Sequence, residues 1–133
     1  MPNGIKFDLD EWIVFLQALA PADAIMRRLA TKHGLKFLTD IQGYWPARRL
    51  VKRRRCRRIE VQLLLDARYL EDKTIVFTLS RMLMFDCGWF WRKDLEYVKL
   101  GEYSPEQMKD HRMLEAVLEK LVLESISRLQ RVP

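Results

Sequence analysis

The sequence lacks the features that define several common protein classes. Two cysteines among 133 residues exclude a disulfide-stapled scaffold, and the two histidines, His33 and His111, occur in no metal-ligand spacing. No apolar run approaches the roughly 20 residues of a membrane-spanning helix. The first residues do not follow the basic-then-apolar order of a signal peptide. We therefore expect a cytoplasmic protein with no membrane contact, no metal and no cofactor.

Catalytic motifs are also scarce. None of the five glycines belongs to a phosphate-binding loop, a dinucleotide fingerprint or a nucleophile elbow. The triplet Glu71-Asp72-Lys73, which follows Asp66, matches the Glu-x-Lys pattern of some nucleases, but it falls in a predicted turn rather than on a strand. Cys56, between two arginines, is interpreted as an incidental thiol, and Cys87 as a turn residue. The sequence predicts no catalytic residue and a protein that is not an enzyme.

The N-terminal third has the spacing of two helices. Asp8 with Glu11 three residues later is typical of a helix start, and apolar residues then recur at helical spacing to about residue 20. Pro21 suits the first turn of a second helix, and Gly34 suits the left-handed residue that ends it. We predict helices over about 8–20 and 21–33.

From Arg57 onward the apolar period changes from helical to two, which indicates strands. A three-residue loop at 71–73 would set Ala67 against Phe77, and one at 86–88 would set Phe77 against Tyr97. The register set by the loop at 86–88 buries Trp89 and Trp91 but leaves Arg81 opposite Lys93 on the apolar face. The pattern predicts an antiparallel meander with one apolar face.

The C-terminal segment has a strong helix start and a wide apolar stripe. Ser104, Pro105 and Gln107 match a capping box with proline at the first helical position, so a helix is expected over about 105–130. Residues 1–133 are then one α+β domain, since domains usually hold about 100–150 residues. Its parts would be two N-terminal helices, a three- to four-stranded antiparallel meander within about 36–100, and a long C-terminal helix packed on one face of the sheet.

Positive charge is concentrated in one segment. Eight of the eleven residues from 48 to 58 are basic and none is acidic. Removing those eight from the 24 basic residues leaves 16 against 18 acidic residues, so the formal charge of +6 comes from this segment alone. Seven of the eight are arginine, whose planar guanidinium binds phosphate through two parallel hydrogen bonds.

The basic segment has no apolar face, either as a strand or as a helix, so we expect an exposed edge strand or arm. One interpretation is structural, because a charged edge resists sheet-to-sheet aggregation. The other is phosphate contact with DNA or RNA, with aromatic residues stacking on unpaired bases. The predicted nucleic-acid-binding residues are Arg48, Arg49, Lys52, Arg53, Arg54, Arg55, Arg57, Arg58, Tyr44 and Trp45, with Tyr69, Phe90 and Tyr103 as further stacking candidates.

Two other binding modes stay open. The segment 24–41 has the loose pattern of a helix-turn-helix, although Gly43 and Pro46 would cut its second helix short. Alternatively, the protein is an interaction module, such as an inhibitor, adaptor or chaperone, for an acidic protein partner or a second copy of itself. Its partner surface would be the outer face of the meander, with Met82, Met84, Phe90 and Val98.

Overall fold

The structure, a computed structural model, describes residues 9–42, 45–54, 58–86 and 92–132. One helix precedes a five-stranded antiparallel sheet and one follows it. The elements are α1 (Leu9–His33), β1 (Lys36–Gln42), β2 (Trp45–Arg53), β3 (Ile59–Tyr69), β4 (Ile75–Asp86), β5 (Arg92–Tyr103), the 3-10 turn η1 (Gln107–Lys109) and α2 (His111–Arg131). The predicted α+β class, antiparallel sheet and C-terminal helix packed on the sheet are confirmed.

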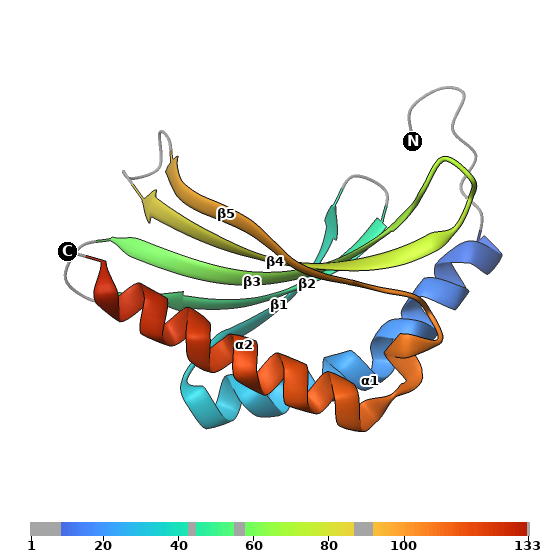
Figure 1. Cartoon of the computed structure of the whole chain (residues 1–133), viewed down its shortest axis with the longest axis horizontal. Coiled ribbons are helices and arrows are strands. Elements are labelled where there is room, and N and C mark those ends of the chain that lie inside the picture. Colours follow the sequence, from blue (N-terminus) through green and yellow to red (C-terminus); the bar gives the residue numbers. More distant parts are fainter. Residues whose placement is uncertain (1–8, 43–44, 55–57, 87–91, 133) are drawn as a thin grey trace.

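The five strands lie side by side in chain order, β1 to β5, so every neighbouring pair is a hairpin. Both helices cover the same face of this meander (Figure 1). Both ends of the sheet bend away from the helices in that view, so the opposite face, called the open face below, is concave. Among the described elements, no helix covers the open face.

The N-terminal region forms one helix instead of the predicted two. Pro21 lies inside α1, although proline in a helix interior costs about 3 kcal/mol through a lost hydrogen bond and a ring clash. The buried stripe runs through it without a phase change: Phe15, Leu19, Ala22, Met26 and Leu29. Because both halves present one face to one core, burial outweighs the proline.

Helix α1 ends as the sequence predicts. Gly34 has φ of 68°, and the backbone N–H of Leu35 donates to Ala30 O at 2.9 Å. This bond from the second residue beyond the helix is the signature of a Schellman cap, in which glycine takes the left-handed conformation without steric cost. The prediction for Gly34 is confirmed.

The C-terminal helix starts later than predicted. The capping box forms, since Gln107 N donates to Ser104 Oγ at 3.2 Å and Ser104 N donates to Gln107 Oε1 at 2.8 Å. It starts only the turn η1, which anchors the buried Met108. Asp110 then caps α2 by accepting from Met113 N at 3.1 Å. The predicted start at about 105 is therefore wrong by one and a half turns or so.

The hairpin between β3 and β4 has the predicted register. Tyr69 pairs with Ile75 and Ala67 pairs with Phe77. Lys73, the last residue of the three-residue loop, has φ of 64° and donates its N–H to Leu70 O at 2.9 Å. The apolar sets of both strands consequently face the helices, because directly opposed residues share one face.

The predicted register between β4 and β5 is wrong. The connection spans residues 87–91, which lie outside the described residues with the predicted core residues Trp89 and Trp91. Phe77 lies opposite Tyr103, and two register shifts interrupt the ladder. Tyr97, predicted to be buried, is 61% exposed because the shift between Leu83 and Met84 moves it to the open face.

The observed register also separates Arg81 from Lys93, because Lys93 pairs with Phe85. Arg81 pairs with Val98 and lies 3.0 Å from Glu96 Oε1. The other oxygen of that carboxylate lies 3.1 Å from the guanidinium of Arg128 on α2. Glu96 thus joins the sheet to the C-terminal helix through two charge-assisted hydrogen-bonded pairs.

Candidate functional site

The basic segment does not form the exposed edge strand that its composition predicts. Its first seven residues lie on β2 or directly after it, and β2 is an interior strand between β1 and β3. Arg48 and Lys52 lie opposite the core residues Leu65 and Val61, whereas Arg49 and Arg53 lie on the open face. Residues 55–57, with Arg55 and Arg57, lie outside the described residues. Each described cation therefore needs its own account.

Arg48 is buried and ion-paired inside the protein. Its side chain is 9% exposed, and Nε lies 2.7 Å from Asp23 Oδ1 on α1. Its Nη1 also donates to Ala47 O at 3.0 Å. A buried guanidinium with a carboxylate and a carbonyl as partners joins helix to sheet, so Arg48 is a structural cation and not a surface contact.

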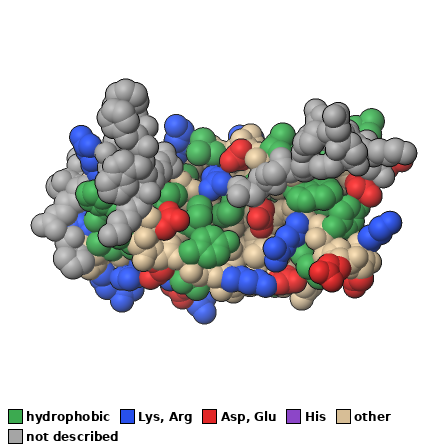
Figure 2. All heavy atoms as spheres, turned by 90° about the horizontal axis from the view of Figure 1, so that it is seen from above, with side chains coloured by type: hydrophobic (Ala, Val, Ile, Leu, Met, Phe, Trp, Pro, Cys, Tyr) green, Lys and Arg blue, Asp and Glu red, His purple; other side chains and the backbone are tan. Residues whose placement is uncertain are grey.

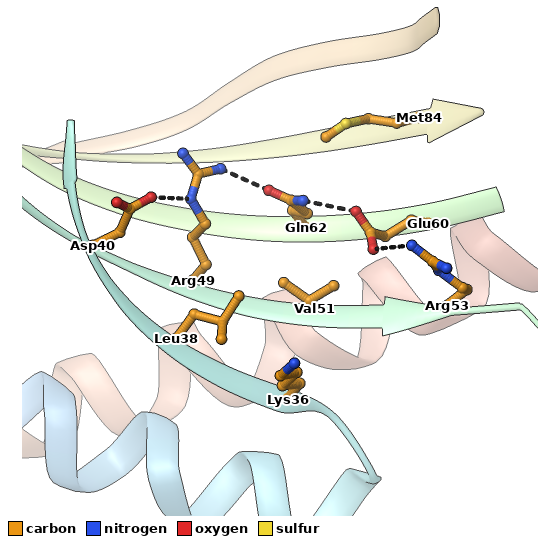
Figure 3. A pocket seen from close by; sticks show the side chains of 9 residues that line it. All are labelled: Lys36, Leu38, Asp40, Arg49, Val51, Arg53, Glu60, Gln62 and Met84. Carbon is orange, nitrogen blue, oxygen red and sulfur yellow. Dashed lines mark hydrogen bonds and ion pairs between the residues drawn. The ribbon is translucent and has the colours of Figure 1, made fainter. Parts of the chain in front are cut away.

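On the open face, a chain of hydrogen bonds links side chains of three strands (Figure 3). Asp40 accepts from Arg49 Nε at 3.2 Å, and Arg49 Nη1 donates to Gln62 Oε1 at 2.6 Å. Gln62 Nε2 donates to Glu60 Oε2 at 2.7 Å, and Arg53 Nη2 lies 3.4 Å from the other oxygen of Glu60. Both Glu60 and Gln62 are buried, so this chain holds polar groups in fixed positions on the sheet.

Two further cations bind the carboxyl ends of the helices instead of carboxylates. Lys52 Nζ donates to His33 O, the last residue of α1, at 3.0 Å. Arg54 Nη1 donates to Leu129 O at 3.3 Å and also to Val132 O, at the end of α2. A helix C-terminus carries only about half an elementary negative charge, so these cations keep part of their positive field.

These ends enclose a hollow of about 700 Å³, called the cationic groove below. It lies between the turn after α1, the end of β2 and the end of α2. The residues that line it are Gly34, Leu35, Lys36, Val51, Lys52, Arg53, Arg54, Leu129 and Gln130. Among these described residues there are four cations and no carboxylate. A cleft lined by one sign of charge concentrates the field and attracts anions.

A second hollow, of about 470 Å³, lies on the open face and is called the polar hollow below (Figure 3). It is lined by the hydrogen-bonded chain together with Lys36 and the apolar side chains of Leu38, Val51 and Met84. Its cations, Lys36, Arg49 and Arg53, face two carboxylates in the same lining. The polar hollow is thus nearly balanced in charge. Figure 2 shows the open face with hydrophobic and charged side chains intermixed.

The predicted stacking residues lie elsewhere or are not described. Trp45 packs against Phe15 of α1 and Tyr69 of β3, with ring centroids 5.2 and 5.1 Å away. Trp45 is partly buried against the core and is not among the residues that line the cationic groove. Tyr103 packs against the same core, while Tyr44 and Phe90 lie outside the described residues.

The predicted partner surface does not form one patch. Met82 and Met84 lie on the open face, but Met84 is only 7% exposed. Val98 pairs with Arg81 and therefore lies on the helix side, because the register shift between Leu83 and Met84 changes its face. Phe90 lies outside the described residues. Of the four predicted residues, only Met82 and Met84 are described together on the open face.

Two alternative motifs take other structures. The predicted second helix of the helix-turn-helix is strand β1, so that motif is wrong. The triplet 71–73 is a hairpin loop, as expected, and its Asp72 accepts from Thr74 N at 3.0 Å.

Among the described residues, no group of three or more histidine, cysteine or acidic side chains could hold a metal ion. In the same part of the chain, no helix has the length and apolar character needed to cross a bilayer.

Sequence reasoning missed Lys36 as a member of both hollows. It stands alone in the sequence, outside the basic segment, and becomes a neighbour of that segment only through its pairing with Val51. The partners of Arg54 at the end of α2 could not be predicted either, because Leu129 and Val132 lie 75 and 78 residues beyond it in the sequence. No local signal points to these partners.

Comparisons with known proteins add no family to this geometry. No protein-family model, no curated protein and no solved structure matches the chain. The fold and the two hollows therefore define the protein as an α+β protein with a five-stranded meander, two helices on one face and a cationic groove at the carboxyl ends of both helices.

Proposed function

We propose that this protein is a non-enzymatic nucleic-acid-binding protein that holds backbone phosphates in the cationic groove. The observation that carries the proposal is the lining of that groove: four cations and no carboxylate among the described residues. Nucleic acids present regularly spaced negative charges, and clustered cations that neutralise them release counterions.

Hydrogen bonds and ion pairs within the protein divide the cations into a buried, structural group and a group that remains at the surface. Arg48 is buried against Asp23 and belongs to the fold. Lys52 and Arg54 bind helix carbonyls, Arg53 pairs with Glu60 but is half exposed, and Arg58 is exposed, so this group, together with the exposed Lys36 of β1, retains positive charge at the surface. The phosphate contacts proposed are Lys36, Lys52, Arg53, Arg54 and Arg58. This is a smaller set than the sequence predicts, and it combines Lys36 of β1 with residues at the end of β2 and in the connection that follows it.

Salt titration of binding tests the proposal. A fluorescently labelled single strand would be titrated with the protein at several salt concentrations and followed by anisotropy. Contact of the five proposed cations with phosphates predicts a log–log salt slope of about −3.5, since each neutralised phosphate of a single strand contributes about −0.7. Binding that does not change with salt would contradict the proposal.

A charge-reversal pair locates the binding surface. Lys36→Glu with Arg58→Glu reverses two exposed cations at the groove end of the protein without touching a helix cap. Arg112→Glu with Lys120→Glu makes the same change in net charge on exposed positions of α2. At 1.5 Å per residue these lie about 25 and 13 Å along the helix from Leu129. The first pair is expected to weaken binding about tenfold more than the second; equal losses would show that net charge alone matters.

A further inference from the structure

The two hollows meet at a shared wall. Lys36, Val51 and Arg53 line both the cationic groove and the polar hollow. In Figure 3, Lys36 and Arg53 stand on neighbouring strands at the same end of the polar hollow. A ligand that lies along the groove can therefore extend a side group over this wall and into the polar hollow without leaving the surface.

The chemistry of the two hollows differs in a way that matches the two parts of a nucleotide. The charged residues that line the groove are all cations, which suits a phosphate. The polar hollow offers fixed hydrogen-bond donors and acceptors above an apolar wall. Unstacked nucleobases are bound by contacts of this kind, through hydrogen bonds to their edges and stacking against side-chain planes that include guanidinium groups.

We propose that the polar hollow binds one unstacked base of a single-stranded nucleic acid whose phosphates lie in the cationic groove. This inference rests on the proposed function. The Glu60 carboxylate, which also accepts from Gln62 and pairs with Arg53, accepts a further hydrogen bond from the exocyclic amino group of the base, and Leu38, Val51 and Met84 contact the ring. The guanidinium of Arg53, which is 53% exposed, stacks at the rim.

This geometry selects single strands over duplexes. A base in a duplex is paired along its edge and stacked on both faces, so it enters a hollow only after it has left the helix, at a cost of a few kcal/mol. The polar hollow, about 470 Å³, falls within the roughly 300–1,000 Å³ typical of small-ligand clefts. A groove that contacted phosphates alone would have no such preference.

The test compares three labelled probes with the full chain at one salt concentration. The probes are a mixed-sequence single strand of about a dozen nucleotides, an abasic strand with the same number of phosphates, and a duplex of the same sequence. We expect the normal strand to bind about tenfold more tightly than the abasic strand, a factor in keeping with measured base contacts. The duplex should bind no more tightly than the abasic strand.

The outcomes separate this inference from the function on which it rests. Equal binding of the normal and abasic strands, or tighter binding of the duplex, would overturn the base pocket while leaving phosphate binding intact. Loss of salt-dependent binding to all three probes would overturn both. A mononucleotide mixture that displaces the strand at the same nucleotide concentration would show that free nucleotides are the ligand, and would overturn the assignment to a strand.

A variant that fills the polar hollow adds an independent test. Leu38 lines the polar hollow but not the cationic groove, so Leu38→Phe places a larger side chain in the hollow alone, and Leu123→Phe makes a matched change on an exposed position of α2. Leu38→Phe should remove the tenfold preference for the normal strand without changing the affinity for the abasic strand. A preference that survives in a folded Leu38→Phe variant would place the base elsewhere.

Discussion

Arg48 Nε lies 2.7 Å from Asp23 Oδ1, and this pair joins an interior strand to the first helix. The arginine is 9% exposed and the aspartate 24%. Taking a guanidinium out of water is costly unless a carboxylate and further acceptors replace its hydration. The most N-terminal member of the basic segment is thus committed to the fold, which a count of charges along the sequence does not reveal.

Asp23→Ala is expected to destabilise the protein by about 3 kcal/mol, because it leaves a buried cation without its partner. The free energy of unfolding would be measured by urea titration. Arg48→Met in the Asp23→Ala background should recover most of the loss, since the unpaired charge is then gone.

Glu115→Ala is the control for this prediction. The Arg28–Glu115 pair has a similar N–O distance, 2.6 Å, but both side chains are more than half exposed. Exposed pairs contribute about 0–1 kcal/mol. A loss at Glu115 as large as that at Asp23 would contradict the distinction drawn between the two pairs.

The Glu96 carboxylate predicts a loss of stability in acid. Burial raises its pKa, but hydrogen bonds and charges from Arg128 and Arg81 outweigh burial and hold the pKa below its ordinary value. A pKa that is lower in the folded state makes the unfolded state bind more protons, so this contribution is present above about pH 4.3 and is lost as the pH falls below it.

Glu96→Gln tests this directly. Unfolding midpoints of the wild type and the variant would be compared from neutral pH to about pH 3. The gap between them should be largest at neutral pH and should shrink in acid, where the wild-type carboxyl is protonated. A gap that stays constant with pH would show that Glu96 acts through shape alone.

Asp66 should change the stability with pH in the direction opposite to Glu96. Burial raises its pKa, and the attraction of Arg68 and Arg49 only partly offsets this effect. The folded state therefore holds the proton more tightly than the unfolded state, and stability falls as the pH rises through the raised pKa. Asp66→Asn should stabilise the protein at neutral pH, with a gain that disappears in acid. A variant that is less stable than the wild type at pH 7 would contradict this sign.

The local features of the fold could be predicted from the sequence, whereas its long-range pairings could not. Gly34 and the loop at 71–73 depend on a few neighbouring residues, so turn chemistry identifies them. The register of β4 with β5 depends on the connection 87–91 and on two shifts, neither of which alternation encodes. The single helix through Pro21 likewise depends on a core that the helix shares with the distant strands.

The positive charge of the candidate site could be predicted from the sequence, but the residues that form the groove could not. The basic segment drew attention to Lys52 and Arg54, yet the residues that turn them into a groove come from the ends of both helices. The interior position of β2 reverses the expected exposure of Arg48, because β1 supplies the edge of the sheet. Charge density is a property of the sequence, but exposure is decided by which elements pack on either side.

Arg58 links stability to the proposed binding. Its φ is 53°, a left-handed conformation that costs an L-residue about 1–2 kcal/mol and glycine very little. Arg58→Gly should raise the free energy of unfolding by about 0.5–1 kcal/mol, since the greater freedom of glycine in the unfolded chain offsets part of the gain. Arg58→Ala, which keeps the left-handed cost, should leave stability nearly unchanged.

The Arg58→Gly substitution should also weaken nucleic-acid binding. Removal of one phosphate contact lowers the magnitude of the single-strand salt slope by about 0.7 and reduces affinity for all sequences alike. Arg58→Lys keeps the charge and should retain the slope, which provides the matched control. A glycine variant that is more stable and binds as tightly as the wild type would remove Arg58 from the proposed phosphate contacts. A variant that is more stable but binds less tightly would show that the left-handed arginine is retained for its charge at the cost of stability.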